Sequence, residues 1–181
     1  MTVAGTYFLV TVGFSLLTAT YALFTERRFG YGAMHNGYIF AAQGLLGAMI
    51  QGLLLGKLLR IFNDKRLVVT GTLALAAGMW LLPESTTVTM LLAATAAIAV
   101  GHALVAAPLN GLASRKAGAS MQGRVFGLMQ SAASLARIVG PVLGGWLLSR
   151  DAGNFSANFG RSPYWASAAI MLGAFVLALA L

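Results

Sequence analysis

Apolar side chains are gathered into six long stretches, and polar side chains are concentrated in the short connections between them. The stretches span residues 3–24, 37–58, 67–82, 88–110, 122–148 and 164–181. About 20 apolar residues in a helix cross the roughly 30 Å hydrocarbon core of a bilayer, so each stretch suits a transmembrane helix. The pattern predicts an all-α integral membrane protein in which residues 1–181 form a single six-helix transmembrane bundle surrounded by membrane lipid.

The fifth stretch, residues 122–148, departs from the apolar pattern near its middle. Gln130, Ser134 and Arg137 follow i, i+4, i+7 spacing, which places all three on one face of a helix. A charge near the centre of a bilayer costs at least a few kcal/mol. We therefore expect Arg137 to face protein or a water-filled cavity rather than lipid.

Small residues and a proline follow on the same predicted helix, at Gly140, Pro141, Gly144 and Gly145. The Gly-Pro pair loosens backbone hydrogen bonding where lipid cannot replace it, so neighbouring helices or water must do so. Together with the polar face, this element predicts a bundle with an interior polar path, which is typical of transporters.

The second stretch carries glycines and uncharged amides. Gly52 and Gly56 form a small-xxx-small step, which lets two helix backbones approach closely in a membrane. Gln43 and Gln51 are each either an interhelical hydrogen-bonding residue or a ligand contact, and we favour the hydrogen bond.

The first and fourth stretches hold the remaining polar candidates. Phe14, Thr18 and Tyr21 share a helical face, which we interpret as a packing stripe in preference to a cavity wall. His102 is either a proton relay or a neutral packing residue, and the lack of a visible acidic partner favours packing. Glu26 is the carboxylate closest to a predicted span, and we interpret it as a solvated helix end rather than a buried proton carrier.

The composition agrees with a membrane protein, because 59% of the residues are hydrophobic and 9% are charged, against about 25% charged in soluble domains. The net charge of +8 does not indicate a nucleic-acid partner, because the cations lie in short runs between apolar stretches. There is no cysteine, and we find no nucleophile–base pair, metal-ligand cluster or phosphate loop. We predict neither an enzyme nor a bound cofactor or metal.

The cations also predict an orientation in the membrane. Seven flank the connections after the second and fourth stretches, and four lie on the other side: Lys57, Arg60, Lys65, Arg66, Arg115, Lys116 and Arg124 against Arg27, Arg28, Arg150 and Arg161. The positive-inside rule then places both termini in the cytoplasm, with the bundle in the cytoplasmic (inner) membrane. The sixth stretch has no charged tail, from which we expect a truncated or split chain.

A short internal repeat relates the two halves of the chain. Gly37 and Phe40 recur as Gly123 and Phe126, and Gln43 and Gln130 fall one residue out of that register. With three helices in each half, the halves have opposite orientations, as in the inverted 3+3 repeats of transporter folds.

Two segments carry a resemblance to a known family: GYIFAAQGLLGAMIQGLLLGKLLRIFNDKRLVVTG and QGRVFGLMQSAASLARIVGPVLGGWL. They resemble the carboxyl-terminal six-helix half of a major facilitator superfamily transporter, and are most similar to drug:proton antiporters related to tetracycline efflux proteins. In that family a cytoplasmic loop signature latches one face of the protein. The matching positions are Gly52, Gly56, Lys57, Arg60, Asp64, Lys65 and Arg66, whereas Asn63 stands where the family often has Gly.

The resemblance implies an architecture and a function. The first and fourth helices would line a central cavity, flanked by the second and fifth, with the third and sixth outside. Its polar wall would be formed by Thr18, Tyr21, Gln43, His102, Gln130 and Arg137. The chain would be half of a secondary active transporter, exporting a small amphipathic solute by alternating access.

Two features separate this chain from a complete transporter. Six helices offer one wall of a cavity, so a second six-helix half is expected, either a missing amino-terminal half or a second copy of the chain. No Asp or Glu lies inside a predicted span, so proton coupling would depend on His102, Glu26 or the other half. The alternative is a six-helix membrane scaffold or assembly subunit that transports nothing, because Gly- and Ala-rich faces serve packing equally well.

Overall fold

The computed structural model describes residues 2–118, 120–151 and 159–181, and these residues form helices without any strand. The elements are α1 (Thr2–Phe29), α2 (Ala33–Met49), the π-helical segment η1 (Ile50–Leu54), α3 (Leu55–Ile61), α4 (Asp64–Leu81), the 3-10 turn η2 (Leu82–Glu84), α5 (Val88–Ala117), α6 (Gln122–Asp151) and α7 (Arg161–Leu179). Six of the resulting helical spans are long and apolar enough to cross a membrane. The all-α, membrane-spanning fold class predicted from the sequence is confirmed.

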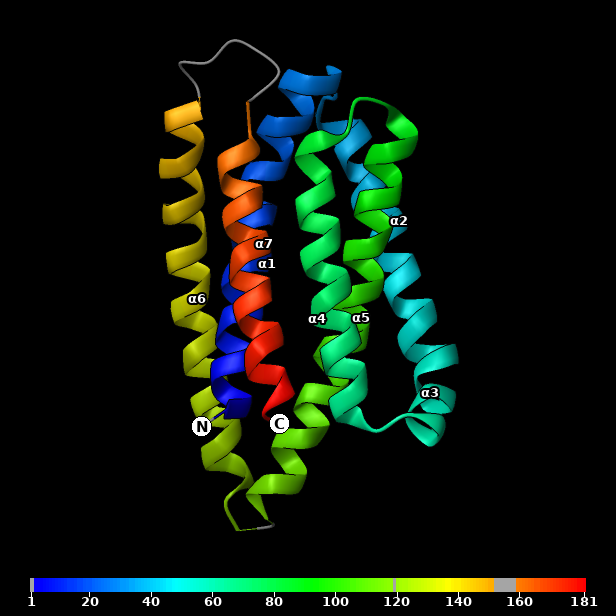
Figure 1. Cartoon of the computed structure of the whole chain (residues 1–181), viewed down its shortest axis with the longest axis vertical. Helices are drawn as coiled ribbons and strands as arrows, with labels where there is room; N and C mark the ends of the chain where they lie inside the picture. Colours follow the sequence, from blue (N-terminus) through cyan, green and yellow to red (C-terminus); the bar gives the residue numbers. More distant parts are fainter. Residues whose placement is uncertain (1, 119, 152–158) are drawn as a thin grey trace.

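The helices run up and down along the long axis of the molecule (Figure 1). The start of α1 and the end of α7 lie at the same end of the bundle, and α7 passes in front of α1 in this view. The segment α2–η1–α3 lies along one edge of the bundle and α6 along the opposite edge. This arrangement gives α1 and α5 a position between the two edge elements.

The helices extend beyond the apolar stretches that predicted them. The first helix continues to Phe29 rather than residue 24, and the fourth to Ala117 rather than residue 110. Hydropathy marks the part of a helix that lies in hydrocarbon, whereas the helix itself continues into the interface. Arg115 and Lys116 occupy the last turn of α5, where cations interact favourably with the helix dipole.

Small residues allow the central helices to pack closely. A Cβ atom added at Gly101 of α5 would lie 2.7 Å from the Gly71 carbonyl oxygen and 2.8 Å from the Leu75 nitrogen of α4. Gly13 of α1 accepts a hydrogen bond from the Ser167 hydroxyl of α7 at 3.3 Å. Such approaches replace the hydrophobic driving force that is missing between helices in lipid.

Two ion pairs connect helix ends. Asp64, the first residue of α4, pairs with Arg115 of α5. At the other end of the bundle Glu84 pairs with Arg161 at 2.9 Å, which ties η2 to the start of α7. Asp151, the last residue of α6, accepts hydrogen bonds from the Ser162 backbone nitrogen at 3.0 Å and the Ser162 hydroxyl at 2.6 Å.

Candidate functional site: a polar wall between two edge helices

One face of the bundle contains two neighbouring hollows. The first, here called the arginine hollow, has a volume of about 530 Å³, and its polar lining consists of Tyr7, Thr11, Ser15, Thr18, His102, Asn110 and Arg137. The second, the amide hollow, has a volume of about 520 Å³ and is lined by Phe14, Thr18, Phe40, Gln43, Gly44, Gly47, Ala48, Gln51, Ala99 and His102. Both volumes fall within the range of roughly 300–1,000 Å³ that is usual for small-molecule sites.

Five elements supply the two linings. Residues of α1 and α5 contribute to both hollows, α6 contributes to the arginine hollow, and α2 and η1 contribute to the amide hollow. Among the described residues, α4 and α7 contribute to neither. The structure therefore places the hollows along α1 and α5, between the edge helices.

An aromatic pair divides the two hollows. The rings of Phe14 and His102 are stacked, with centroids 4.3 Å apart and planes inclined by 24°. Phe14, His102 and Thr18 line both hollows. His102 thus has a packing contact, as the sequence favoured, while also facing the hollow.

Arg137 lies near the midpoint of α6 and lines the arginine hollow. The neighbouring positions Ala133, Ala136 and Gly140 are buried, so α6 turns its small residues inward. The guanidinium has no ion pair or hydrogen bond to any residue in the described part of the chain. Arg137 is therefore a free cation at mid-height of the bundle.

Gln130 and Ser134 share the exposed face of α6 with Arg137, and the Ser134 hydroxyl donates to the Gln130 carbonyl oxygen at 3.0 Å. Neither residue lines the arginine hollow. Gln130 precedes Arg137 by seven residues, which is roughly 10 Å along a helix. It lies on the predicted face but nearer the end of the bundle.

Tyr21 requires a correction, because the sequence placed it on the cavity wall through the family resemblance. Its side chain is fully buried, and its hydroxyl lies 3.3 Å from the Thr95 hydroxyl of α5. The Gln43 side-chain nitrogen donates to the Thr95 backbone oxygen at 3.4 Å. Thr95 thus connects α5 to α1 and to α2, and the packing interpretation describes Tyr21 better.

The glycines of α2 and α6 differ in their surroundings. A Cβ atom added at Gly140 would lie 2.7 Å from the Ser15 Cβ atom of α1, and one at Gly144 would lie 3.0 Å from the Thr20 methyl group. Pro141 and Gly145 are exposed, and α6 continues through Pro141. By contrast, no described residue lies within 4 Å of a Cβ atom added at Gly52 or Gly56, so the close approach expected there does not occur within this chain.

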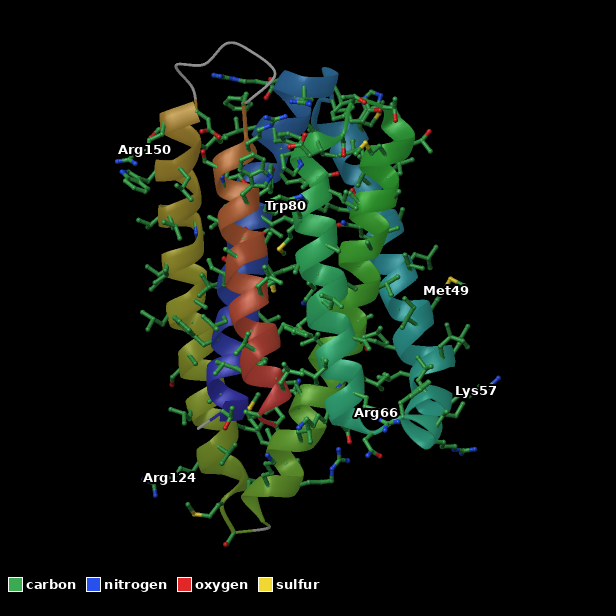
Figure 2. The ribbon with its side chains drawn as sticks, viewed as in Figure 1. Met49, Lys57, Arg66, Trp80, Arg124 and Arg150 are labelled. Atoms are coloured by element: carbon green, nitrogen blue, oxygen red, sulfur yellow. The ribbon has the colours of Figure 1, made fainter. Side chains whose placement is uncertain are left out.

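The loop signature lies at the end of the bundle that holds both chain ends. Lys57 and Arg66 extend at this end, together with Arg124, whereas Arg150 lies at the opposite end (Figure 2). Lys57, Arg60, Lys65 and Arg66 are exposed. Gly52 belongs to η1, Gly56 belongs to α3, and Asp64 is held by Arg115, which the signature did not include.

Sequence reasoning missed part of the arginine hollow. Tyr7 and Thr11 line it together with Phe14 and Thr18, and these four residues follow helical spacing on one face. Asn110 lies two turns after His102 on α5 and also lines the hollow. Extending the stripe from Phe14 towards the start of α1 would have identified the first two.

The comparisons with known proteins decide the family. The Major Facilitator Superfamily profile matches residues 3–181. The chain belongs to the major facilitator superfamily. The resemblance to this superfamily that the sequence suggested is confirmed.

Relatives extend the comparison. The chain is 28% identical over 130 residues to the class D tetracycline resistance protein of Salmonella ordonez, an alignment that covers 72% of the chain and 33% of that protein. It is 31% identical over 143 residues to multidrug resistance protein 2 of Bacillus subtilis (strain 168), covering 77% of the chain and 35% of that protein. The aligned region is thus about one third of the length of these relatives.

A solved structure has the same fold. The crystal structure of the human organic anion transporter MFSD10 (TETRAN) superposes with a TM-score of 0.84 and 22% sequence identity, covering 98% of this chain and 40% of that one. The fold of the present chain therefore also occurs as part of a much longer membrane protein.

Proposed function

We propose that this chain is one half of a secondary active transporter that exports a small amphipathic solute by alternating access with a second six-helix half. The observation that carries the proposal is the pair of hollows along α1 and α5, with α2 and α6 at their edges. A wall of this kind becomes an enclosed site when a second wall faces it. The tetracycline and multidrug resistance relatives support efflux as the direction of transport.

The second half is either a further six-helix segment or a second copy of this chain. The open glycines Gly52 and Gly56 support such a mate, because small residues in membrane helices usually accommodate a neighbouring backbone. The recurrence of Gly37 and Phe40 as Gly123 and Phe126 supports a 3+3 inverted repeat in which α2 and α6 occupy equivalent positions. The seven cations at the end that holds both termini support a cytoplasmic location for that end, in the inner membrane.

Proton coupling, if the transporter uses it, would depend on groups outside these hollows or on His102. Glu26 lies in the last turns of α1, and Asp64, Glu84 and Asp151 lie at other helix ends. None of the four lines a hollow. The second half is therefore the expected source of a proton-carrying carboxylate.

Reconstitution in proteoliposomes tests the proposal. The chain is incorporated alone and together with a candidate six-helix mate, and the uptake of tetracycline is followed with and without an imposed proton gradient. The assembled mass is measured in parallel. We expect transport from an assembly of twelve helices. An assembly that forms but moves no solute would favour the scaffold alternative, and a stable six-helix monomer that neither assembles nor transports would refute the proposal.

A further inference from the structure

Arg137 is the charged residue at mid-height of the bundle, and no acidic residue among those described lies at the same height. The chain has twelve Lys and Arg residues. Eleven lie near the two ends of the bundle, and the twelfth, Arg137, lies near the midpoint of α6 in the lining of the arginine hollow. A cation at this depth is costly unless water or an anion accompanies it.

The chain supplies no anion for Arg137. Two of its four acidic residues are engaged in ion pairs, Asp64 with Arg115 and Glu84 with Arg161. Asp151 accepts two hydrogen bonds from Ser162, and Glu26 is exposed near the end of α1. In the part of the chain that the structure describes, the arginine hollow is therefore lined by a cation and by neutral groups.

The surroundings of Arg137 favour an aromatic ligand with an acidic group. The stacked rings of Phe14 and His102 form a flat surface in the lining that Arg137 shares. Offset or edge-on contact with such rings stabilises a further aromatic ring. Carboxylates and sulfonates match the planar guanidinium, which donates two parallel hydrogen bonds to them. Tyr7, Thr11 and Asn110 add neutral hydrogen-bonding groups.

We propose that the arginine hollow is the subsite for the acidic group of an amphipathic aromatic anion. Arg137 binds the carboxylate or sulfonate, and the Phe14–His102 pair contacts the ring. This inference rests on the proposed transport function and specifies its substrate class. Its competitor is a carboxylate of the second half that pairs with Arg137 and leaves the hollow neutral.

Three probes with the same ring and different head charges test the proposal: 2-naphthoate, 2-naphthalenemethanol and 2-naphthylmethylammonium. Their binding is measured to the full chain, assembled with its mate, in nanodiscs of zwitterionic lipid. We expect 2-naphthoate to bind at least tenfold more tightly than the alcohol and the ammonium to bind most weakly. Arg137→Gln should remove this preference, leave the affinity for the alcohol within twofold, and be partly rescued by Arg137→Lys.

Arg124→Gln is the matched control, because Arg124 is an exposed cation on the same helix at the end of the bundle (Figure 2). It should change no probe affinity by more than twofold. A preference for the ammonium, an Arg137→Gln variant that keeps the preference for 2-naphthoate, or no binding of any probe would overturn the proposal. The alternative is that Arg137 pairs with a carboxylate of the second half. It would be supported if Arg137→Gln no longer assembles and the assembled wild type binds all three probes equally.

The transport assay separates this inference from the proposed function. A reconstituted assembly that moves tetracycline or the cationic probe but ignores 2-naphthoate would refute the anion subsite and leave transport intact. Binding of 2-naphthoate through Arg137 without any flux would establish the subsite and refute transport.

Discussion

The two elements at the edges of the hollows are attached to the bundle in different ways. α6 packs against α1 through Gly140 and Gly144, whose missing side chains allow the backbones to approach. α2 is attached through Ile39, which lies in the apolar core, and through polar groups. The Thr25 hydroxyl lies 2.7 Å from the Asn36 side-chain oxygen, and Gln43 donates to the Thr95 carbonyl oxygen. Both α6 and the α2–η1–α3 segment contain two glycines four residues apart. Such a pair therefore does not show by itself whether another helix of the chain packs against it.

The difference is greatest where α2 becomes η1 and α3. The glycines from Gly44 to Gly56 have no described neighbour within 4 Å of an added Cβ atom. The π-helical turn Ile50–Leu54 interrupts the α-helix in the same region, and π turns are frequent at functional sites. The α6 edge is therefore packed against α1 at Gly140 and Gly144 and is called the completed edge below, although Gly123, Gly127 and Gly145 are open. The α2–η1–α3 edge, called the open edge, has no such contact at any of its glycines among the described residues.

The largest expected effect comes from filling the completed edge. In Gly140→Leu the new side chain collides with Ser15 and with the Leu16 backbone nitrogen, which lies 2.9 Å from the Cβ position. Overpacking of this kind costs about 1–3 kcal/mol. We expect a loss near the upper limit in the free energy of unfolding, measured by SDS titration in mixed micelles.

Gly56→Leu is the matched control on the open edge. The isolated chain should keep its stability or gain less than about 1 kcal/mol, because leucine is the better helix former. An equal loss of unfolding free energy in both variants would show that the two edges are packed alike, which contradicts the difference described above.

The second effect concerns assembly rather than folding. With the proposed second half present, Gly56→Leu places a bulky side chain where a helix is expected to approach. We expect the affinity between the two halves to fall at least tenfold, or about 1.4 kcal/mol, as measured by energy transfer between labelled halves in lipid. Unchanged association would mean that the open glycines contact lipid.

The sequence predicted the parts of this architecture that depend on periodicity and charge. Six apolar stretches identified the spans, and the isolated cation in the fifth identified Arg137 as a residue that faces a hollow. Periodicity could not separate Tyr21 from Thr18, because residues three apart lie on almost the same helical face. Their different burial depends on Thr95, which comes from a distant part of the chain.

The sequence also could not predict which of the glycine pairs would be packed against another helix of the chain. Gly52 and Gly56 satisfy the same local pattern as Gly140 and Gly144, but packing requires a second helix at the correct height. The interruption by η1 has no clear signal in the local apolar pattern either. These features depend on tertiary contacts, which the local sequence pattern does not specify.

The third effect tests how α2 is anchored at its start. Asn36 is buried, and its side chain contacts Thr25 of α1 and the Tyr31 carbonyl oxygen. Asn36→Ala removes both contacts and should cost about 1 kcal/mol, the usual net value of a hydrogen bond. Hydrogen exchange should increase in the first turns of α2 while α6 stays protected. Equal acceleration in both helices would show that the bundle loosens as a whole.

The smallest effect separates anchoring from ligand contact at Gln43. Its bond to the Thr95 carbonyl oxygen is 3.4 Å long and the side chain is partly exposed at the amide hollow, so Gln43→Leu should cost only about 0.5 kcal/mol of stability. If Gln43 serves mainly to hold α2, the affinities for the three naphthalene probes should stay within twofold. A selective loss for 2-naphthalenemethanol, measured by titration in nanodiscs, would instead identify the amide hollow as the site for neutral polar groups. In that case the polar attachment of α2 would also be part of the binding site, and the two edges would differ in function as well as in packing.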